Sequence, residues 1–218
     1  MASVATVAVH LTRIYTRTGD AGTSRIADGS EVSKNDPRLA AYADCDEANA
    51  VLGVVLALGN PAEHLATVIC RVQNELFDVG ADLATPVIPD PQWEPLRVTP
   101  EYVQALEADC DVLNEGLPAL DSFILPGGTP AAALLHQART VTRRAERSAW
   151  ALVAHDPDGT NVLACRYLNR LSDLLFIMAR LANPDGDVRW VPGGERADPS
   201  ARRRSGVRRT GAADGLLE

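Results

Sequence analysis

Ten consecutive residues near the N-terminus combine the groups that proteins use to bind phosphate. Residues 15–24 read YTRTGDAGTS and contain two glycines, four Ser/Thr hydroxyls, one arginine and one carboxylate. Since glycine allows positive φ and close backbone approach, such a loop can turn its N–H groups and hydroxyls toward a polyanion. A carboxylate beside phosphate needs a metal ion between the two, so Asp20 also indicates a divalent metal. The alternative is an ordinary Gly/Ser/Thr turn before the first helix.

Three arginines form a second candidate site, on a helix predicted from about 129 to 155. Arg139, Arg143 and Arg147 recur every four residues, which stacks their side chains on one helix face. Like charges at this spacing repel each other. The row therefore indicates either an anionic ligand or the acidic partners of a salt-bridged surface helix.

Polar residues within otherwise apolar helices raise the question of their partners. Residues 161–182 are largely apolar but carry Asn169, Ser172 and Asp173 at mid-length. An unpaired buried polar group costs about 1–3 kcal/mol, so these side chains should have polar neighbours. Asp46, in the first predicted helix, raises the same question with acidic sign. We expect it to pair with an arginine of the long helix, in the same chain or a neighbouring one.

An apolar loop, FILPGG at residues 123–128, comes directly before the long helix. Its phenylalanine, Phe123, could line a pocket. The alternative is a loop that only packs on the core where the helix begins.

Helical periodicity covers most of the chain and defines the elements that hold these groups. Thr99-Pro100 and Thr129-Pro130 are typical helix starts, with an N-cap followed by proline in the first turn. Alternating β-branched residues are almost absent apart from Val4 to Val9. The predicted helices cover residues 39–58, 62–83, 99–117, 129–155 and 161–182. The pattern predicts an all-α bundle of four or five helices.

Composition narrows the class of protein. The 218 residues, 46% of them hydrophobic, contain no apolar run of the roughly 18 residues that a membrane span needs. No signal-peptide regions open the chain, so we expect a cytoplasmic protein without membrane segments. The net charge of −8 argues against nucleic-acid binding. Four widely spaced cysteines are predicted to be buried thiols: Cys45, Cys70, Cys110 and Cys165.

The last residues of the chain differ in composition from the rest. Residues 193–218 place arginines among Gly, Ser and Ala with little to bury, which predicts a disordered tail. An anion-binding arm is the alternative. We take residues 1–192 as one helical domain.

Six motifs, in this order, resemble the PduO-type cob(I)alamin adenosyltransferases, over roughly residues 13–191. They are TRTGDAGT at 16–23, SKNDPR at 33–38, DEAN at 46–49, FILPGG at 123–128, RRAER at 143–147 and LNRLSD at 168–173.

This resemblance implies a fold, a reaction and a set of ligands. The fold would be a five-helix up-down bundle of ferritin-like packing, assembled as a homotrimer with active sites between subunits and an irregular N-terminal nucleotide-binding loop. The reaction would transfer the 5′-deoxyadenosyl group of ATP to the cobalt of cob(I)alamin, which gives adenosylcobalamin and triphosphate. Mg²⁺ would be bound mainly through the ATP phosphates. A flavin reductase and an adenosylcobalamin-dependent mutase are the implied partners.

The resemblance also implies roles for individual residues. Those implied to bind ATP are Thr16, Arg17, Thr18, Gly19, Asp20, Gly22, Thr23, Ser24, Lys34, Arg143, Glu146, Arg147 and Asn169. Those implied to bind cobalamin are Phe123, Asp46, Arg139 and Asp173. Asp46 and Arg139 would form an intersubunit ion pair beside the corrin, and Phe123 would shield the lower face of cobalt. Together with Arg143, these three would form the catalytic set.

One departure from the family limits the transfer of roles. Arg17 and Ala21 stand where the family loop usually has lysine. Arginine still binds phosphate, with a different geometry, whereas Ala21 cannot.

Three other functions are alternatives to this enzyme. A cobalamin escort that delivers adenosylcobalamin to a mutase would share every site residue. A ferritin-like dimetal bundle needs Glu-x-x-His pairs, but no Glu precedes His136 or His155 by three positions. A purely structural helical protein would leave the arginine row unexplained.

Overall fold

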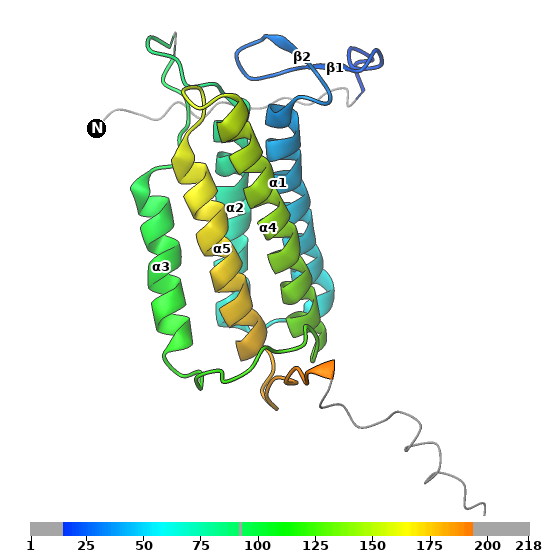
Figure 1. Ribbon diagram of the computed structural model, residues 1–218, viewed down its shortest axis with the longest axis vertical. Coiled ribbons are helices and arrows are strands. Elements are labelled where there is room, and N and C mark those ends of the chain that lie inside the picture. Colours follow the sequence, from blue (N-terminus) through cyan, green and yellow to red (C-terminus); the bar gives the residue numbers. More distant parts are fainter. Residues whose placement is uncertain (1–14, 92, 194–218) are drawn as a thin grey trace, which may run out of the picture.

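Five helices form the body of the protein, whose computed structural model describes residues 15–91 and 93–193 (Figure 1). They are α1 (Pro37–Val54), α2 (Glu63–Ala84), α3 (Pro100–Asn114), α4 (Pro130–His155) and α5 (Val162–Leu181). α1 packs against α2 and α4, while α5 packs against α4 and α3. The predicted five helices are therefore confirmed. Of the predicted tail, residues 193–218, all but the first residue lie outside the described residues.

Side-chain caps set where three of the helices begin. Asp36 accepts a hydrogen bond from the Arg38 N–H at the start of α1. Thr129 caps α4 by accepting from the Ala132 N–H, as the sequence predicts. Asn161 does the same for α5. Thr99 is the N-cap residue of α3, as the sequence predicts, but its side chain makes no capping hydrogen bond.

The C-terminal end of α1 continues as a π-helical turn, η1 (Val55–Gly59). A Cβ on Gly59 would lie 3.1 Å from the Cα of Ala131, in the first turn of α4. Glycine therefore allows the two backbones to approach closely. This contact places the end of α1 beside the beginning of α4.

A small antiparallel hairpin precedes α1, and the all-α prediction missed it. Strands β1 (Thr23–Arg25) and β2 (Glu31–Ser33) pair with Thr23 opposite Ser33. Strands of three residues are too short to show a two-residue alternation, which explains the miss. The segment Val4–Val9, where alternation was noted, lies outside the described residues.

The cysteine prediction is only partly correct. Cys45 and Cys165 are buried in the core, Cys110 is half-buried, and Cys70 is exposed. Ile69 occupies the core-facing position of α2, and the next residue is rotated by about 100° around the helix toward solvent. Position within the helical period therefore decides exposure here. No helix within residues 15–91 and 93–193 is long and apolar enough to cross a bilayer.

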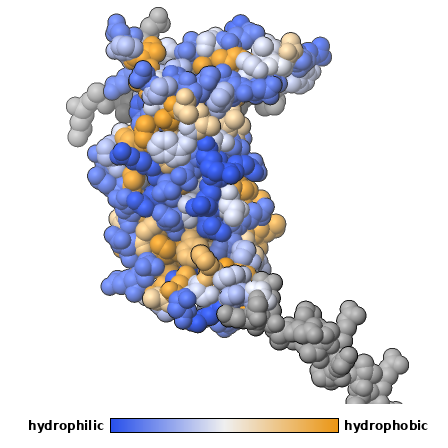
Figure 2. All heavy atoms as spheres, viewed as in Figure 1, coloured by the Kyte–Doolittle hydropathy of each residue, from blue (hydrophilic) through white to orange (hydrophobic). Residues whose placement is uncertain are grey.

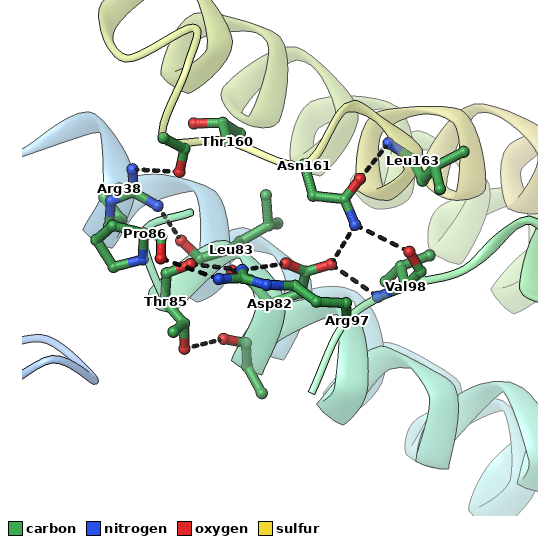
Figure 3. Close-up of polar contacts among 12 residues, drawn as sticks. Arg38, Asp82, Leu83, Thr85, Pro86, Arg97, Val98, Thr160, Asn161 and Leu163 are labelled. Atoms are coloured by element: carbon green, nitrogen blue, oxygen red, sulfur yellow. Dashed lines mark hydrogen bonds and ion pairs between the residues drawn. The ribbon is translucent and has the colours of Figure 1, made fainter. Parts of the chain in front are cut away.

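A buried carboxylate fixes the long crossover between α2 and α3 (Figure 3). Asp82 accepts from the Arg97 guanidinium at 2.6 Å, from the Val98 N–H at 2.7 Å and from the Asn161 amide at 2.6 Å. Nearby, Arg38 donates to the carbonyls of Leu83 and Gly159. These bonds tie α1, α2 and the start of α5 together at the hairpin end of the bundle.

Candidate functional site

A large cavity opens at the end of the bundle where α4 begins. Its volume is about 1000 Å³. The lining residues are Leu120, Asp121, Ser122, Phe123, Ile124, Pro126, His136, Arg139, Arg143, Phe176, Trp190 and Pro192. Most of them are apolar, while α4 contributes an imidazole and two guanidinium groups. A cavity of this size and character suits a large, mainly apolar ligand that also carries polar groups.

The chain after α5 pairs with the loop that carries Phe123. The Leu125 N–H donates to the Val188 carbonyl at 2.8 Å, and the Trp190 N–H donates to the Phe123 carbonyl at 2.8 Å. The Phe123 and Trp190 rings meet edge to face with centroids 6.1 Å apart. Phe123 is nevertheless 79% exposed. Its backbone is thus fixed while its ring remains available to a ligand.

A polar network, which we call the C-terminal clasp, anchors this pairing. It consists of Arg180, Asn183 and Asp187. Arg180 donates to Asp187 at 3.0 Å, and both side chains are at most 10% exposed. Asn183 donates to Asp187 and to the Gly127 carbonyl, and accepts from the Thr129 N–H. A Cβ at Gly128 (φ +104°) would overlap the Asn183 side chain, so only glycine fits there.

The arginine row divides into one half-buried member and two exposed ones. Arg139 lies with its guanidinium carbon 5.9 Å from the centroid of the Phe176 ring. Burial, followed by the charge of Arg143, lowers the pKa of the Arg139 guanidinium. Arg143 and Arg147 are exposed, and no acidic residue in the described part of the chain forms an ion pair with either. The alternative of a salt-bridged surface helix therefore does not explain Arg143 and Arg147.

The acidic residues on α1 that form ion pairs with α4 bind a different arginine, outside the row. Arg144, one position around α4, forms ion pairs with Asp44 and Glu47. Asp46 is exposed and pairs with no arginine among the described residues. The same-chain form of the predicted Asp46 pair is therefore wrong, because Asp44 and Glu47 occupy the positions of α1 that face α4. The intersubunit form stays a prediction.

Two predicted residues do meet between α4 and α5. The Asn169 amide donates to the Glu146 carboxylate at 3.1 Å. Both line a second cavity of about 460 Å³, which α3 also borders through Val103 and Glu107. Asp173 is exposed and accepts from Arg170.

The N-terminal loop is open and exposes most of its functional groups. Gly22 takes a positive φ of 85°, as the loop interpretation requires, and Arg17 also takes a positive φ of 64°. The Thr16 and Thr18 hydroxyls lie 2.8 Å apart. Asp20 is exposed, whereas Thr23 and Ser24 are half-buried in β1.

Lys34 joins the N-terminal loop through both its backbone and its side chain. Its N–H donates to the Gly22 carbonyl at 2.9 Å. Its Nζ would lie 3.0 Å from a Cβ on Gly19. The hairpin therefore folds the single lysine of the chain back across the loop, as its predicted phosphate role requires.

The hairpin that follows the N-terminal loop lies at one end of the bundle, and the segment before α4, which lines the cavity, lies at the other (Figure 1). No hydrogen bond or ion pair within residues 15–91 and 93–193 joins the loop to the arginine row. Figure 2 shows strongly hydrophilic side chains over the middle of the face formed by α4 and α5. In one chain the row therefore lies between the two ends without contacting the loop.

Comparison with known proteins places this arrangement in a family. A sequence model of the cobalamin adenosyltransferases matches residues 14–182. The chain belongs to the cobalamin adenosyltransferase family.

Several relatives of this adenosyltransferase have similar length. The corrinoid adenosyltransferase of Mycobacterium tuberculosis is 62% identical over 190 residues, which cover 87% of this chain and 98% of the relative. That of Mycobacterium leprae is 56% identical over 191 residues, which cover 86% of this chain and all of the relative. Among solved structures, a phenylalanine-to-alanine variant of the PduO-type ATP:corrinoid adenosyltransferase from Lactobacillus reuteri, complexed with cobalamin and ATP, has a TM-score of 0.76. It is 38% identical and covers 83% of this chain and 100% of its own.

The chain is thus an ATP:cobalamin adenosyltransferase of the PduO type, and its cavity contains residues that the sequence analysis did not single out. His136, Phe176 and Trp190 line the cavity beside Phe123. His136 and Phe176 sit at core-like positions of their helices. One available signal was the spacing of His136 three residues before Arg139, which puts both on one helix face. Trp190 gave no signal, because only the folded clasp brings it to Phe123.

Proposed function

We propose that this adenosyltransferase transfers the 5′-deoxyadenosyl group of ATP to the cobalt of cob(I)alamin and releases triphosphate. One observation carries the proposal: a mainly apolar cavity of about 1000 Å³ adjoins the arginine row. The two exposed members of that row, Arg143 and Arg147, have no acidic partner in the described chain. An apolar macrocycle and a polyanion are the two kinds of ligand that these surfaces fit. The Lactobacillus reuteri neighbour, with both cobalamin and ATP, supports the pairing.

The reaction needs no nucleophile from the protein. Reduced cobalt attacks C5′ of ATP, so that a cobalt–carbon bond forms, the C5′–O bond breaks and triphosphate leaves with the bonding electron pair. The protein must place C5′ in line with cobalt and stabilise charge on the leaving group. Arg143, Arg147 and Lys34 supply positive charge for the second task. Glu146 and Asn169, which meet between α4 and α5, would orient the ribose or adenine.

The N-terminal loop would hold the triphosphate. Its groups are Thr16, Arg17, Thr18, Gly19, Asp20, Gly22, Thr23 and Ser24. The described residues contain no group of three His, Cys, Asp or Glu that could hold a metal ion, and Asp20 is the one carboxylate within the loop. This donor set fits Mg²⁺ that is held mainly by ATP phosphates, with Asp20 beside it. When bound, Mg²⁺ would offset the charge of the leaving triphosphate.

The cavity would bind the corrinoid. Phe123 would cover the lower face of cobalt, and an apolar ring there leaves the metal four-coordinate. Four-coordinate cobalt(II) is easier to reduce, which would allow a flavin reductase to supply the electron. Asp173 would complete the corrinoid contacts from α5.

A trimer would bring the two half-sites together. The loop and the arginine row of one chain lie apart, so a neighbouring chain can supply the missing half. Asp46 is exposed and without an arginine partner in the described chain, which leaves it available to Arg139 of a neighbouring chain.

Anaerobic incubation of the protein with cob(I)alamin and Mg-ATP tests the proposal. We expect the visible spectrum of a cobalt–carbon bond and one triphosphate for each product. Because ATP is the only adenosyl source, product formation also separates the enzyme from a pure cobalamin escort. Bound cobalamin with no adenosylcobalamin and no triphosphate would contradict the proposal.

A further inference from the structure

The floor of the large cavity contains polar atoms that have no partner in the described structure. His136 is 2% exposed, and neither of its ring nitrogens makes a hydrogen bond. The Nε of Arg139, one helical turn further along α4, is also buried and unpaired. Buried polar groups are nearly always hydrogen-bonded, and each that is not costs stability. Three such atoms beside one another are therefore a feature that needs a reason.

Their location indicates what that reason is. Both side chains line the large cavity, and both contact the same aromatic ring, that of Phe176. The His136 ring meets it edge to face at 6.0 Å, and the Arg139 guanidinium carbon lies 5.9 Å from its centroid. Phe176 thus packs against both side chains at the border of the cavity.

The chemistry of the pair specifies the ligand group. Burial and the nearby Arg139 charge lower the pKa of His136, which favours the neutral ring. A neutral imidazole offers one acceptor nitrogen and one N–H donor. Arg139 Nε offers a donor only. A primary amide carries both a donor N–H and an acceptor oxygen, and it is uncharged, as an apolar cavity requires. A phosphate, in contrast, would leave the acceptor nitrogen unsatisfied.

We propose that His136 and Arg139 together bind a primary amide on the rim of the corrin ring, His136 accepting from the amide N–H and Arg139 Nε donating to its oxygen. The inference rests on the proposed function, since it assumes a corrinoid in this cavity. It makes His136 a corrinoid-recognition residue. The two guanidinium NH₂ groups of Arg139 remain free for the intersubunit pair with Asp46.

Thr142 provides a matched control within the same helix. Its hydroxyl is also buried and unpaired, but Thr142 does not line the cavity. If unpaired polar atoms on α4 were only imperfections of the core, removal of either should have the same consequence. Under the proposal, only His136 should affect the ligand.

The experiment compares His136→Phe, His136→Gln, His136→Ala and Thr142→Val with the wild type as folded full-length proteins. Thermal unfolding is measured without ligand. The dissociation constants of ATP and of cob(II)alamin, the latter with ATP saturating, are measured from spectra. A final titration uses cobinamide, which lacks the lower nucleotide but keeps the ring amides.

His136→Phe keeps the ring contact with Phe176 and removes both nitrogens. We expect its Kd for cob(II)alamin to rise about tenfold, the factor that corresponds to roughly 1.4 kcal/mol, and the same rise for cobinamide. The melting temperature and the ATP Kd should not worsen. His136→Gln, which retains a donor and an acceptor, should recover most of the affinity, and Thr142→Val should bind like the wild type.

Three results would overturn the inference. The first is an unchanged corrinoid affinity in folded His136→Phe. If that variant does not fold, the equivalent result is a corrinoid affinity of His136→Gln that is no better than that of His136→Ala. The second is an affinity loss for cobalamin that disappears with cobinamide, because the imidazole would then bind the nucleotide tail. The third is an ATP Kd that rises with the corrinoid Kd. Failure of the wild type and Thr142→Val to bind any corrinoid would instead refute the proposed function itself.

Discussion

The two ends of the bundle are built in different ways. At the cavity end, the loop carrying Phe123 is hydrogen-bonded to the segment after α5 and fixed by the buried Arg180–Asp187 pair. At the other end, the N-terminal loop exposes most of its functional groups and is held mainly through the hairpin. One chain therefore contains a preformed cavity, whereas the loop proposed to bind phosphate is open. Under the proposed function, the corrinoid would meet a preformed surface, whereas ATP would meet groups that a neighbouring chain and the nucleotide itself bring together.

Removal of Arg143 should have the largest effect on this arrangement, since Arg143 belongs to the row proposed to bind the phosphates and also lines the cavity. The side chain is exposed and has no acidic partner in the described chain. Arg143→Ala should lower turnover about 100-fold or more and leave the melting temperature unchanged. Steady-state kinetics and thermal unfolding check this. Turnover close to that of the wild type would remove Arg143 from the phosphate site.

Disruption of the C-terminal clasp should affect only the cavity end. Asp187→Asn leaves the buried Arg180 charge uncompensated, which should lower the free energy of unfolding by about 3 kcal/mol. The corrinoid Kd should rise while the ATP Kd stays the same. Urea unfolding and two separate titrations measure these quantities. A parallel loss of ATP binding would show that the two ends are not independent.

Replacement of Phe123 should lower turnover from cob(II)alamin and have little effect on stability. Its ring is 79% exposed, so Phe123→Ala should unfold at nearly the wild-type temperature. Turnover from cob(II)alamin with a reductase should fall at least about tenfold, the equivalent of 1.4 kcal/mol. ATP affinity should be retained. Unchanged cob(II)alamin turnover would argue against the four-coordinate cobalt.

Loss of the lysine should weaken ATP binding by a moderate factor. Lys34 is exposed and reaches the loop from β2, and a charge-assisted bond at such a site is worth about 1 kcal/mol. Lys34→Ala should therefore raise the ATP Kd about fivefold and leave corrinoid binding unaffected. Isothermal titration with Mg-ATP tests this. Unchanged ATP affinity would place the phosphates elsewhere.

The smallest expected effect is on stability and distinguishes two N-cap residues that look identical in the sequence. Thr129→Ala removes a capping bond to Ala132 and should destabilise the protein by about 1 kcal/mol. Thr99→Ala removes no cap and should be nearly neutral. Equal losses in the two variants would contradict the difference seen in the structure.

Local signals explain why the helices could be predicted and the cavity could not. Helix geometry makes both Thr129-Pro130 and the four-residue arginine spacing readable from the sequence. The structure confirms the helix start and places all three arginines within α4. The partners of Arg144 depend on which face of α1 packs against α4, which no local pattern reveals. The pairing of Phe123 with Trp190 joins residues far apart in the chain. His136 resembles a core residue until the cavity beside it is known.

Mixing two inactive variants tests most directly whether the site is shared between chains. Lys34→Glu places a negative charge in the loop, which should disable it more fully than the loss of charge in Lys34→Ala, and Arg143→Ala disables the row. The two proteins are denatured together and refolded as mixed oligomers. If each site takes its loop from one chain and its row from the next, about a quarter of the wild-type activity should return, because each of the two chains must carry the intact group. No activity above that of the separately refolded variants would show that one chain supplies both halves, and would contradict the account.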